Sequence, residues 1–170
     1  SIAEVQKCAL MVNYYAEMKP QLQLEKVKTD FAISEIHYVP KGVILGVMPW
    51  NFPFWQVLRF AVPAILAGNT IVLKHASICI ESGDKIQEIF EKAGFPIGVF
   101  THLEIGHDEV AELLEHDFVQ GVSFTGSEDA GGKIASIAGK NIKKSLLELG
   151  GSDAFIVLDD ADLKNAAKVG

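Results

Sequence analysis

The sequence predicts an α/β fold, in which an open and largely parallel sheet is flanked by helices. Short apolar runs rich in β-branched residues, such as 43–48 and 70–74, are typical of buried strands. Segments with apolar residues at helical spacing, such as 81–93, separate these runs. Because the two patterns alternate along the chain, they favour βαβ units and therefore parallel strands.

The run at residues 43–48 leads into Pro49-Trp50-Asn51-Phe52-Pro53, and a long apolar stretch follows. We interpret this segment as a strand, a tight turn and a helix. Asn51 is a favoured helix N-cap residue, and Pro53 suits the first helical turn, where its missing N–H costs nothing. Ligands of open α/β sheets bind at the carboxyl ends of the strands, so a ligand is expected near Trp50 and Asn51.

Residues 1–41 are expected to form an N-terminal helix and extended strands. Apolar residues at helical spacing predict a helix over 2–18, with Cys8 as a small buried side chain on its apolar stripe. Lys19-Pro20 is expected to end this helix. Residues 25–39 are predicted to be extended, and a turn at Pro40-Lys41-Gly42 precedes the core strand.

Residues 42–170 are expected to form the domain built on the sheet. After the first strand, further strands are predicted at 70–74, 99–103, 121–124, 145–149 and 154–158. Helices are predicted at 52–67, 81–93, 108–115, 128–138 and 161–169. Gly94 suits the position after its helix, because glycine readily adopts the left-handed conformation that ends many helices.

Composition argues against several classes of function. Fifteen Lys and Arg against 22 Asp and Glu give a net charge of −7, which argues against a broad nucleic-acid-binding surface. The longest apolar run is interrupted by Arg59, so no membrane span or leader peptide is expected. The cysteines show no metal or disulfide spacing, which predicts no metal site and a cytoplasmic protein. The chain is also expected to be truncated at both ends.

Two strand ends carry residues suited to a nucleotide. Gly126, Ser127 and Gly131 follow a predicted strand and open a helix, where backbone N–H groups favour a phosphate. The alternative is that these glycines serve only close packing. Lys74 and Ser77 follow the second strand, where dinucleotide folds contact the adenosine ribose. Their alternative roles are an exposed lysine and a helix N-cap serine.

Two other polar side chains could take part in catalysis. Glu148 lies between Leu147 and Leu149, where loss of solvent would raise the pKa of its carboxyl group and suit a general base. The alternative is a glutamate that points into solvent. The side-chain amide of Asn51 could donate a hydrogen bond to an oxyanion, which is compatible with a role as N-cap.

Four segments, in this order, resemble motifs of the aldehyde dehydrogenase superfamily. They are Pro49-Trp50-Asn51-Phe52-Pro53, Ala67-Gly68-Asn69-Thr70-Ile71-Val72-Leu73-Lys74, Phe124-Thr125-Gly126-Ser127 with Gly131, and Leu147-Glu148-Leu149-Gly150-Gly151. The resemblance extends from about Gly42 to the end of the chain. Within the superfamily, Pro53-Phe54-Trp55-Gln56, Arg59-Phe60 and Lys74-His75-Ala76-Ser77 are most similar to bacterial NAD(P)-dependent succinate-semialdehyde dehydrogenases.

This resemblance implies a Rossmann-like cofactor-binding domain and a role for particular residues. Asn51 would be the side-chain donor of the oxyanion hole, and Glu148 the general base that activates the hydrolytic water. Ser77, where many NAD-linked relatives have glutamate, implies NADP as the preferred cofactor and NAD as the second. The cofactor-binding residues it implies are Met48, Pro49, Trp50, Asn51, Lys74, Ser77, Gly106, Phe124, Gly126, Ser127, Gly131 and Leu149.

The chain departs from the family pattern in two places. Ser152-Asp153-Ala154 stands where many relatives have a lysine, and the nucleophilic cysteine expected after Glu148 is absent. The resemblance therefore implies the NAD(P)-binding part, truncated before the catalytic domain, of a homo-oligomeric enzyme. That enzyme would oxidise an aldehyde, succinic semialdehyde, to the acid, and the chain alone would be inactive. A non-catalytic nucleotide-binding or interaction module, and an acylating or acyl-phosphate-reducing relative, remain alternatives.

Overall fold

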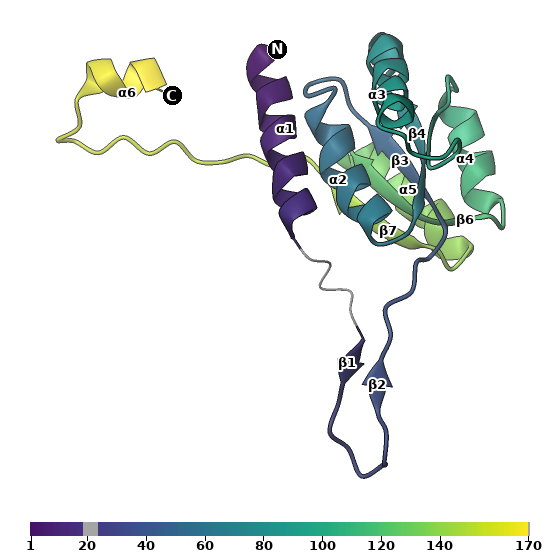
Figure 1. The fold of residues 1–170 in the computed structure, drawn as a ribbon. Coiled ribbons are helices and arrows are strands. Elements are labelled where there is room, and N and C mark those ends of the chain that lie inside the picture. Colours follow the sequence, from purple (N-terminus) through teal and green to yellow (C-terminus); the bar gives the residue numbers. More distant parts are fainter. Residues whose placement is uncertain (19–23, 170) are drawn as a thin grey trace.

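The computed structural model describes residues 1–18 and 24–169, and Figure 1 shows how its elements are arranged. Five strands form one sheet in the order β5-β4-β3-β6-β7. Every neighbouring pair in this sheet is parallel. The predicted α/β fold with a parallel sheet is therefore confirmed. The strands are β3 Val43–Met48, β4 Thr70–His75, β5 Phe100–His102, β6 Val119–Thr125 and β7 Lys144–Glu148.

Helices cover both faces of this sheet. Helices α2 (Trp55–Leu66) and α3 (Ile80–Lys92) pack on one face, over a core that includes Met48, Ile71 and Phe90. Helices α4 (His107–Glu115) and α5 (Glu128–Lys140) pack on the other, over Leu45, Val122 and Phe124. The 3₁₀ turn η1 (Ser77–Cys79) joins β4 to α3.

The order of the strands positions the site. The chain builds outward from β3 through β4 to β5, and then returns to place β6 on the other side of β3. The connections therefore diverge between β3 and β6, and such a reversal opens a crevice at the carboxyl ends of the strands. Gly46 of β3 lets α2 lie close to the sheet, because a Cβ there would stand 2.2 Å from Cζ of Phe60.

The N-terminal part of the chain packs against this body and extends from it. Helix α1 (Ile2–Glu17) lies beside α2, with Cys8 buried at 4% exposure. The short antiparallel strands β1 (Glu25–Lys26) and β2 (Glu35–Ile36) form an arm that projects away from the sheet (Figure 1). The helix end predicted at Lys19-Pro20 lies outside the described residues.

Two predicted elements differ from the structure. Helix α2 begins at Trp55, and its N-cap residue is Phe54, so the predictions of a helix from Phe52 and of Asn51 as its N-cap are wrong. The strand predicted at 154–158 is also wrong. That segment leads away from the sheet toward α6 (Leu163–Val169), and within the described part of the chain it pairs with no strand (Figure 1).

A membrane-spanning helix is not found in the described parts of the chain, where no helix combines the required length and hydropathy.

Candidate active site

A cleft of about 510 Å³ lies at the carboxyl ends of β3, β6 and β7. The turn after β3 and the ends of β6 and β7 supply most of its wall, and α2 supplies the rest. The sequence-predicted residues brought together here are Pro49, Trp50, Asn51, Gly126, Glu148 and Leu149. Gln56, Arg59, Thr125 and Gly150 complete the lining.

The turn that carries Asn51 is held from the side of α1. Oε1 of Glu4 accepts hydrogen bonds from the backbone N–H of Phe54 at 2.9 Å and of Trp55 at 3.0 Å. Glu4 is only 7% exposed. A carboxylate is favourable at this position, because the first N–H groups of a helix lack partners and the helix end carries partial positive charge. Glu4 therefore takes the capping role that the sequence suggested for Asn51.

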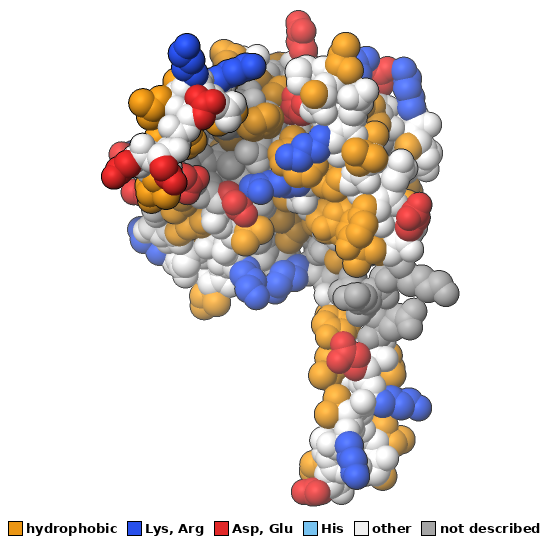
Figure 2. All heavy atoms as spheres, turned by 90° about the vertical axis from the view of Figure 1, so that its left-hand side faces the viewer, with side chains coloured by type: hydrophobic (Ala, Val, Ile, Leu, Met, Phe, Trp, Pro, Cys, Tyr) orange, Lys and Arg blue, Asp and Glu red, His pale blue; other side chains and the backbone are white. Residues whose placement is uncertain are grey.

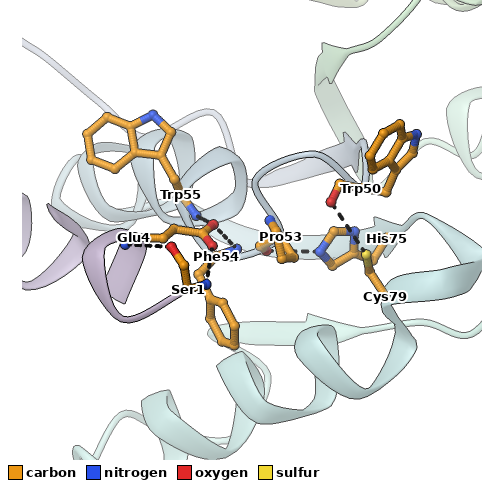
Figure 3. Close-up of polar contacts among 8 residues, drawn as sticks. All are labelled: Ser1, Glu4, Trp50, Pro53, Phe54, Trp55, His75 and Cys79. Atoms are coloured by element: carbon orange, nitrogen blue, oxygen red, sulfur yellow. Dashed lines mark hydrogen bonds and ion pairs between the residues drawn. The ribbon is translucent and has the colours of Figure 1, made fainter. Parts of the chain in front are cut away.

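The same turn is held from the side of β4 and η1, as Figure 3 shows. The Nε2 atom of His75 lies 2.9 Å from the carbonyl oxygen of Pro53, and the N–H of Ala76 donates to Nδ1 at 2.8 Å. The Cys79 thiol lies 3.9 Å from the carbonyl oxygen of Trp50 and donates to it. Burial lowers the pKa of the His75 imidazole and raises that of the Cys79 thiol.

Glu148 enters the cleft from the last residue of β7. Its Oε2 atom lies 3.2 Å from Nη2 of Arg59, and the two side chains are 52% and 32% exposed. Alternation along β7 turns Leu147 toward α5 and Glu148 toward the side of α2. The desolvated carboxylate expected between two leucines is therefore not found. Glu148 is instead a partly exposed carboxylate paired with a guanidinium.

A second hollow, of about 500 Å³, lies between α4 and α5. Phe124 and Ser127, both predicted from the sequence, line it together with Val47 of β3. The Oγ atom of Ser127 accepts from the N–H of Ala130 at 3.4 Å and so caps α5. Gly106 is the N-cap residue of α4, directly before residues that line this hollow.

The glycines of the turn after β6 have a packing role. A Cβ at Gly126 would stand 2.6 Å from Cζ of Phe124, and a Cβ at Gly131 would stand 2.4 Å from Cδ2 of Leu149. Both contacts are closer than real Cβ atoms show, so a side chain at either position would force its neighbour to move. Phe124 is buried and has little room to do so, whereas Leu149 is exposed. The structure thus supports the packing alternative, which does not conflict with a ligand bound above the turn.

Neither the cleft nor the hollow between α4 and α5 is lined by Lys74 or Ser77. Both residues lie at the carboxyl end of β4. Lys74 is 4% exposed, so the alternative of an exposed lysine is wrong. Burial lowers the pKa of its ammonium group. Lys74 is the register partner of Val47 and shares its strand face with Val72, which places it on the α4–α5 side of the sheet. Ser77 is exposed and opens η1.

Met48, like Phe124, is a predicted cofactor residue that belongs to the core. It is 3% exposed and packs under α2. It also lines a hollow of about 360 Å³ beneath the cleft, which Gln56, Arg59 and Glu148 line as well. Met48 therefore supports the floor of the site.

Sequence reasoning missed two residues of α2 that face the cleft, Gln56 and Arg59. The Oε1 atom of Gln56 is buried and finds no hydrogen-bond partner in the part of the chain that the structure describes. A signal was available, because residues three apart on a helix share a face and this helix starts at the predicted ligand site. Glu4 and His75 gave no such signal, since their contacts join distant parts of the chain.

Metal ligands do not gather within residues 1–18 and 24–169, where no group of three or more His, Cys, Asp and Glu could hold an ion. The cleft instead offers an amide, a carboxylate and a guanidinium. These groups can donate to an oxyanion, accept a proton from water and bind an anionic substrate group, respectively.

The chain is similar to known proteins in both sequence and structure. The family model described as the aldehyde dehydrogenase family matches residues 1–170. A probable succinate-semialdehyde dehydrogenase [NADP(+)] of Synechocystis sp. is 55% identical, over 99% of this chain and 37% of its own length. A succinate semialdehyde dehydrogenase [NAD(P)+] of Escherichia coli is 46% identical, over 98% of this chain and 36% of its own length.

The fold is also similar to that of a solved structure. The crystal structure of succinic semialdehyde dehydrogenase from Streptococcus pyogenes, in complex with NADP⁺ as the cofactor, superposes with a TM-score of 0.90 at 44% identity. The match covers 98% of this chain and 37% of that one, so the chain spans little more than a third of these relatives. On the family match and these identities, the chain belongs to the aldehyde dehydrogenase family.

Proposed function

We propose that this chain is the cofactor-binding part of an NADP-linked succinate-semialdehyde dehydrogenase, called below the full-length enzyme. The observation that carries the proposal is the cleft where Asn51, Arg59 and Glu148 meet, at the reversal of strand order. Relatives named for this activity support it. A non-catalytic module has no use for an amide, a base and a cation at one strand edge. A relative that does not hydrolyse its acyl intermediate has no use for a hydrolytic base.

The residues present fit NADP⁺. The hollow between α4 and α5 suits an adenosine, with Val47 and Phe124 as apolar walls, and the cleft suits the nicotinamide end. The buried Oε1 of Gln56, which has no partner among the described residues, is an acceptor beside that cleft that a ligand N–H could use. Lys74 and Ser77 would hold the adenosine ribose and its 2′-phosphate. Bound NADP⁺ supplies the hydride acceptor of the oxidation.

Asn51 and Glu148 would serve the two halves of the reaction. A nucleophile that attacks the aldehyde carbon leaves charge on the carbonyl oxygen, and the Asn51 amide, which lines the cleft, would donate to that oxygen. Release of the acid needs a water that loses a proton as it attacks, and the Glu148 carboxylate, which also lines the cleft, would accept that proton. The nucleophile is not one of this chain's two thiols, because Cys8 and Cys79 are both buried.

Arg59 would bind the carboxylate that distinguishes succinic semialdehyde from neutral aldehydes. Its guanidinium lines the cleft beside Asn51 and is partly exposed, so it can reach an anion there. Guanidinium groups bind carboxylates through paired, charge-assisted hydrogen bonds. The ion pair with Glu148 shows that Arg59 already reaches a carboxylate in this cleft.

Steady-state kinetics of the full-length enzyme test the substrate. We expect a higher kcat/KM for succinic semialdehyde than for butanal, an uncharged aldehyde of equal carbon number. Arg59→Met should lower kcat/KM for succinic semialdehyde by about tenfold or more and leave butanal within about threefold, as loss of a charged hydrogen bond predicts. Lys140→Met removes an exposed cation far from the cleft and serves as control. Higher activity on butanal in the wild type would overturn the substrate assignment.

Titration with NADP⁺ and NAD⁺ tests the cofactor. Ser77 places no negative charge at the end of β4, where Lys74 adds a positive one. We expect tighter binding of NADP⁺, and Ser77→Glu should reverse the order, since a charge pair a few Å apart near a surface is worth a few kcal/mol. Ser136→Glu, on the exposed side of α5, adds the same charge elsewhere. An unchanged preference in Ser77→Glu would contradict the role of this segment.

We also infer that residues 1–170 alone oxidise no aldehyde and that the full-length enzyme is a homo-oligomer. Burial keeps both thiols from the cleft, and it raises the pKa of each. The arm exposes apolar side chains, among them Phe31 and Ile33 at 81% and 78%. Figure 2 shows hydrophobic side chains on the surface of the arm. Such side chains suit an interface. Aldehyde-dependent NADPH formation by the isolated chain, or a monomer by light scattering of the full-length enzyme, would contradict these inferences.

A further inference from the structure

His75 is a buried polar residue that the proposed chemistry does not use. It is the last residue of β4, its exposure is 3%, and both of its ring nitrogens are hydrogen-bonded. The backbone N–H of Ala76 can only donate, so Nδ1 accepts and carries no proton. The carbonyl of Pro53 can only accept, so Nε2 carries the proton and donates. One neutral tautomer satisfies both contacts.

The bond to Pro53 joins two segments of the site, and the bond from Ala76 fixes the ring within its own segment. Pro53 belongs to the turn that carries Asn51, and Ala76 directly precedes Ser77 in the segment assigned to the cofactor. On the turn's other side, Glu4 holds the N–H groups of Phe54 and Trp55. The peptide between Pro53 and Phe54 is thus fixed at its carbonyl by His75 and at its N–H by Glu4 (Figure 3). Rotation of this peptide would shift Asn51, which lies two residues earlier.

The charged groups around His75 favour the neutral ring. Burial is the main cause of its lowered pKa and outweighs the backbone hydrogen bonds to Pro53 and Met48, which act in the opposite direction. The neighbouring His102 of β5 and Lys74 of β4 also lower this pKa. The Glu4 carboxylate on α1 is already occupied by the two N–H groups of α2. A protonated ring would still donate to Pro53 but could not accept from Ala76, so the fixed orientation of the ring depends on the neutral form.

We propose that His75 is a positioning residue that places the Asn51 amide and links it to the cofactor-binding segment. The inference rests on the proposed function, because it assigns His75 an effect that acts through Asn51. Placement matters here, since an error of about 1 Å at a remote residue can cost about a hundredfold in rate. An ordinary core histidine would affect folding but not the reaction in this way.

Two conservative substitutions separate the two hydrogen bonds. In His75→Gln the amide nitrogen can replace Nε2–H toward Pro53, whereas in His75→Asn the amide oxygen can replace only Nδ1 toward Ala76. The rate of the NADPH burst should fall about tenfold or more in His75→Asn and stay within about threefold in His75→Gln. His102→Asn removes a second buried ring in the adjacent strand and keeps a donor toward Asp84, so it controls for general loss of packing.

A double-mutant cycle shows whether His75 acts through Asn51. If it does, His75→Asn should cost little further burst rate in an Asn51→Ala background, because the donor it positions is gone. An equal fold-loss in both backgrounds would overturn the proposal. Equal burst rates in His75→Gln and His75→Asn would overturn it as well.

A readout without turnover distinguishes failure of this inference from failure of the proposed function. The indole ¹⁵N–¹H signal of Trp50, assigned with Trp50→Phe, reports the position of the turn whether or not the enzyme accepts succinic semialdehyde. It should move in His75→Asn and remain near its wild-type position in His75→Gln and His102→Asn. An unmoved signal in His75→Asn overturns the inference, whereas absence of any burst in the wild type refutes the proposed function alone.

Discussion

The turn after β3 and the end of β7 both reach the cleft, but they are held in different ways. The turn is fixed by hydrogen bonds from Glu4, His75 and Cys79, which come from three separate elements. Glu148 ends the outermost strand on its side of the sheet, half-exposed and with a single ion pair to Arg59. An oxyanion donor helps only if it is in place before charge develops, whereas a base must follow a mobile water. The rigid turn and the open strand end suit these two roles.

The largest expected effects come from removing the two functional groups themselves. In the full-length enzyme, Asn51→Ala should lower the burst of NADPH by about a hundredfold or more, as loss of an oxyanion donor does. Glu148→Gln should keep the burst and lose steady turnover, because only release of the acid needs the base. Stopped-flow absorbance at the NADPH band separates the two phases.

Matched controls exist for both substitutions. Asn165→Ala and Glu115→Gln remove the same functional groups at exposed positions on α6 and α4. Both variants should keep the wild-type burst and turnover. Equal loss of the burst and of steady turnover in Asn51→Ala and Glu148→Gln would contradict the separate roles given to the two residues, oxyanion donor and hydrolytic base.

The next largest effect is expected when a support of the turn is removed. Glu4→Ala leaves two backbone N–H groups of α2 without an acceptor, at a cost of about 1–3 kcal/mol. Amide hydrogen exchange in the first turn of α2 should then be faster by about tenfold or more, measured by mass spectrometry of the full-length enzyme. Glu4→Gln keeps an acceptor oxygen and should show a smaller change. Glu17→Ala, exposed on the same helix, should leave the rate unchanged.

This contrast also marks how far the sequence could predict the molecule. Alternating apolar runs and helical segments predicted the parallel sheet correctly, because local patterns of burial determine strands and helices. The cap of α2 could not be predicted this way. Its acceptor, Glu4, lies 50 residues from Phe54 in the chain, and no local pattern connects the two. Tertiary contact thus overrode the preference of Asn51 for the N-cap.

The wrong predictions for the chain around and after β7 have a different cause. The apolar run at 154–158 has strand-like composition, but a strand also needs a neighbour with which to exchange hydrogen bonds. Within the described residues it has none, and Ile156 is 77% exposed. The environment of Glu148 was equally beyond local reasoning, since the partner that defines it, Arg59, lies on α2.

A smaller effect is expected when pH changes the support at His75. The pKa of this imidazole is lowered by burial, so the unfolded chain binds its proton more readily than the folded chain. Its contribution to stability is therefore complete above pH 6.5 and is lost as pH falls through the folded pKa. The loss is at most about 1.4 kcal/mol for each pH unit below 6.5. Thermal unfolding at pH 7.5 and 5.5 should show this decrease for the wild type and a weaker one for His75→Gln. An identical pH dependence in both proteins would show that His75 titrates as an ordinary exposed histidine.

The smallest effect on stability is expected at the open strand end. The Arg59–Glu148 pair joins partly exposed side chains, and such pairs contribute only about 0–1 kcal/mol. A double-mutant cycle of Arg59→Met and Glu148→Gln, followed by thermal unfolding, should give a coupling energy in that range. The coupling should fall further in 1 M salt, which screens exposed charges over a few Å. A coupling of several kcal/mol that resists salt would mean that the strand end is as firmly held as the turn. Glu148 would then be fixed in an ion pair and could not serve as a base that follows a water, and the contrast between the two regions would fail.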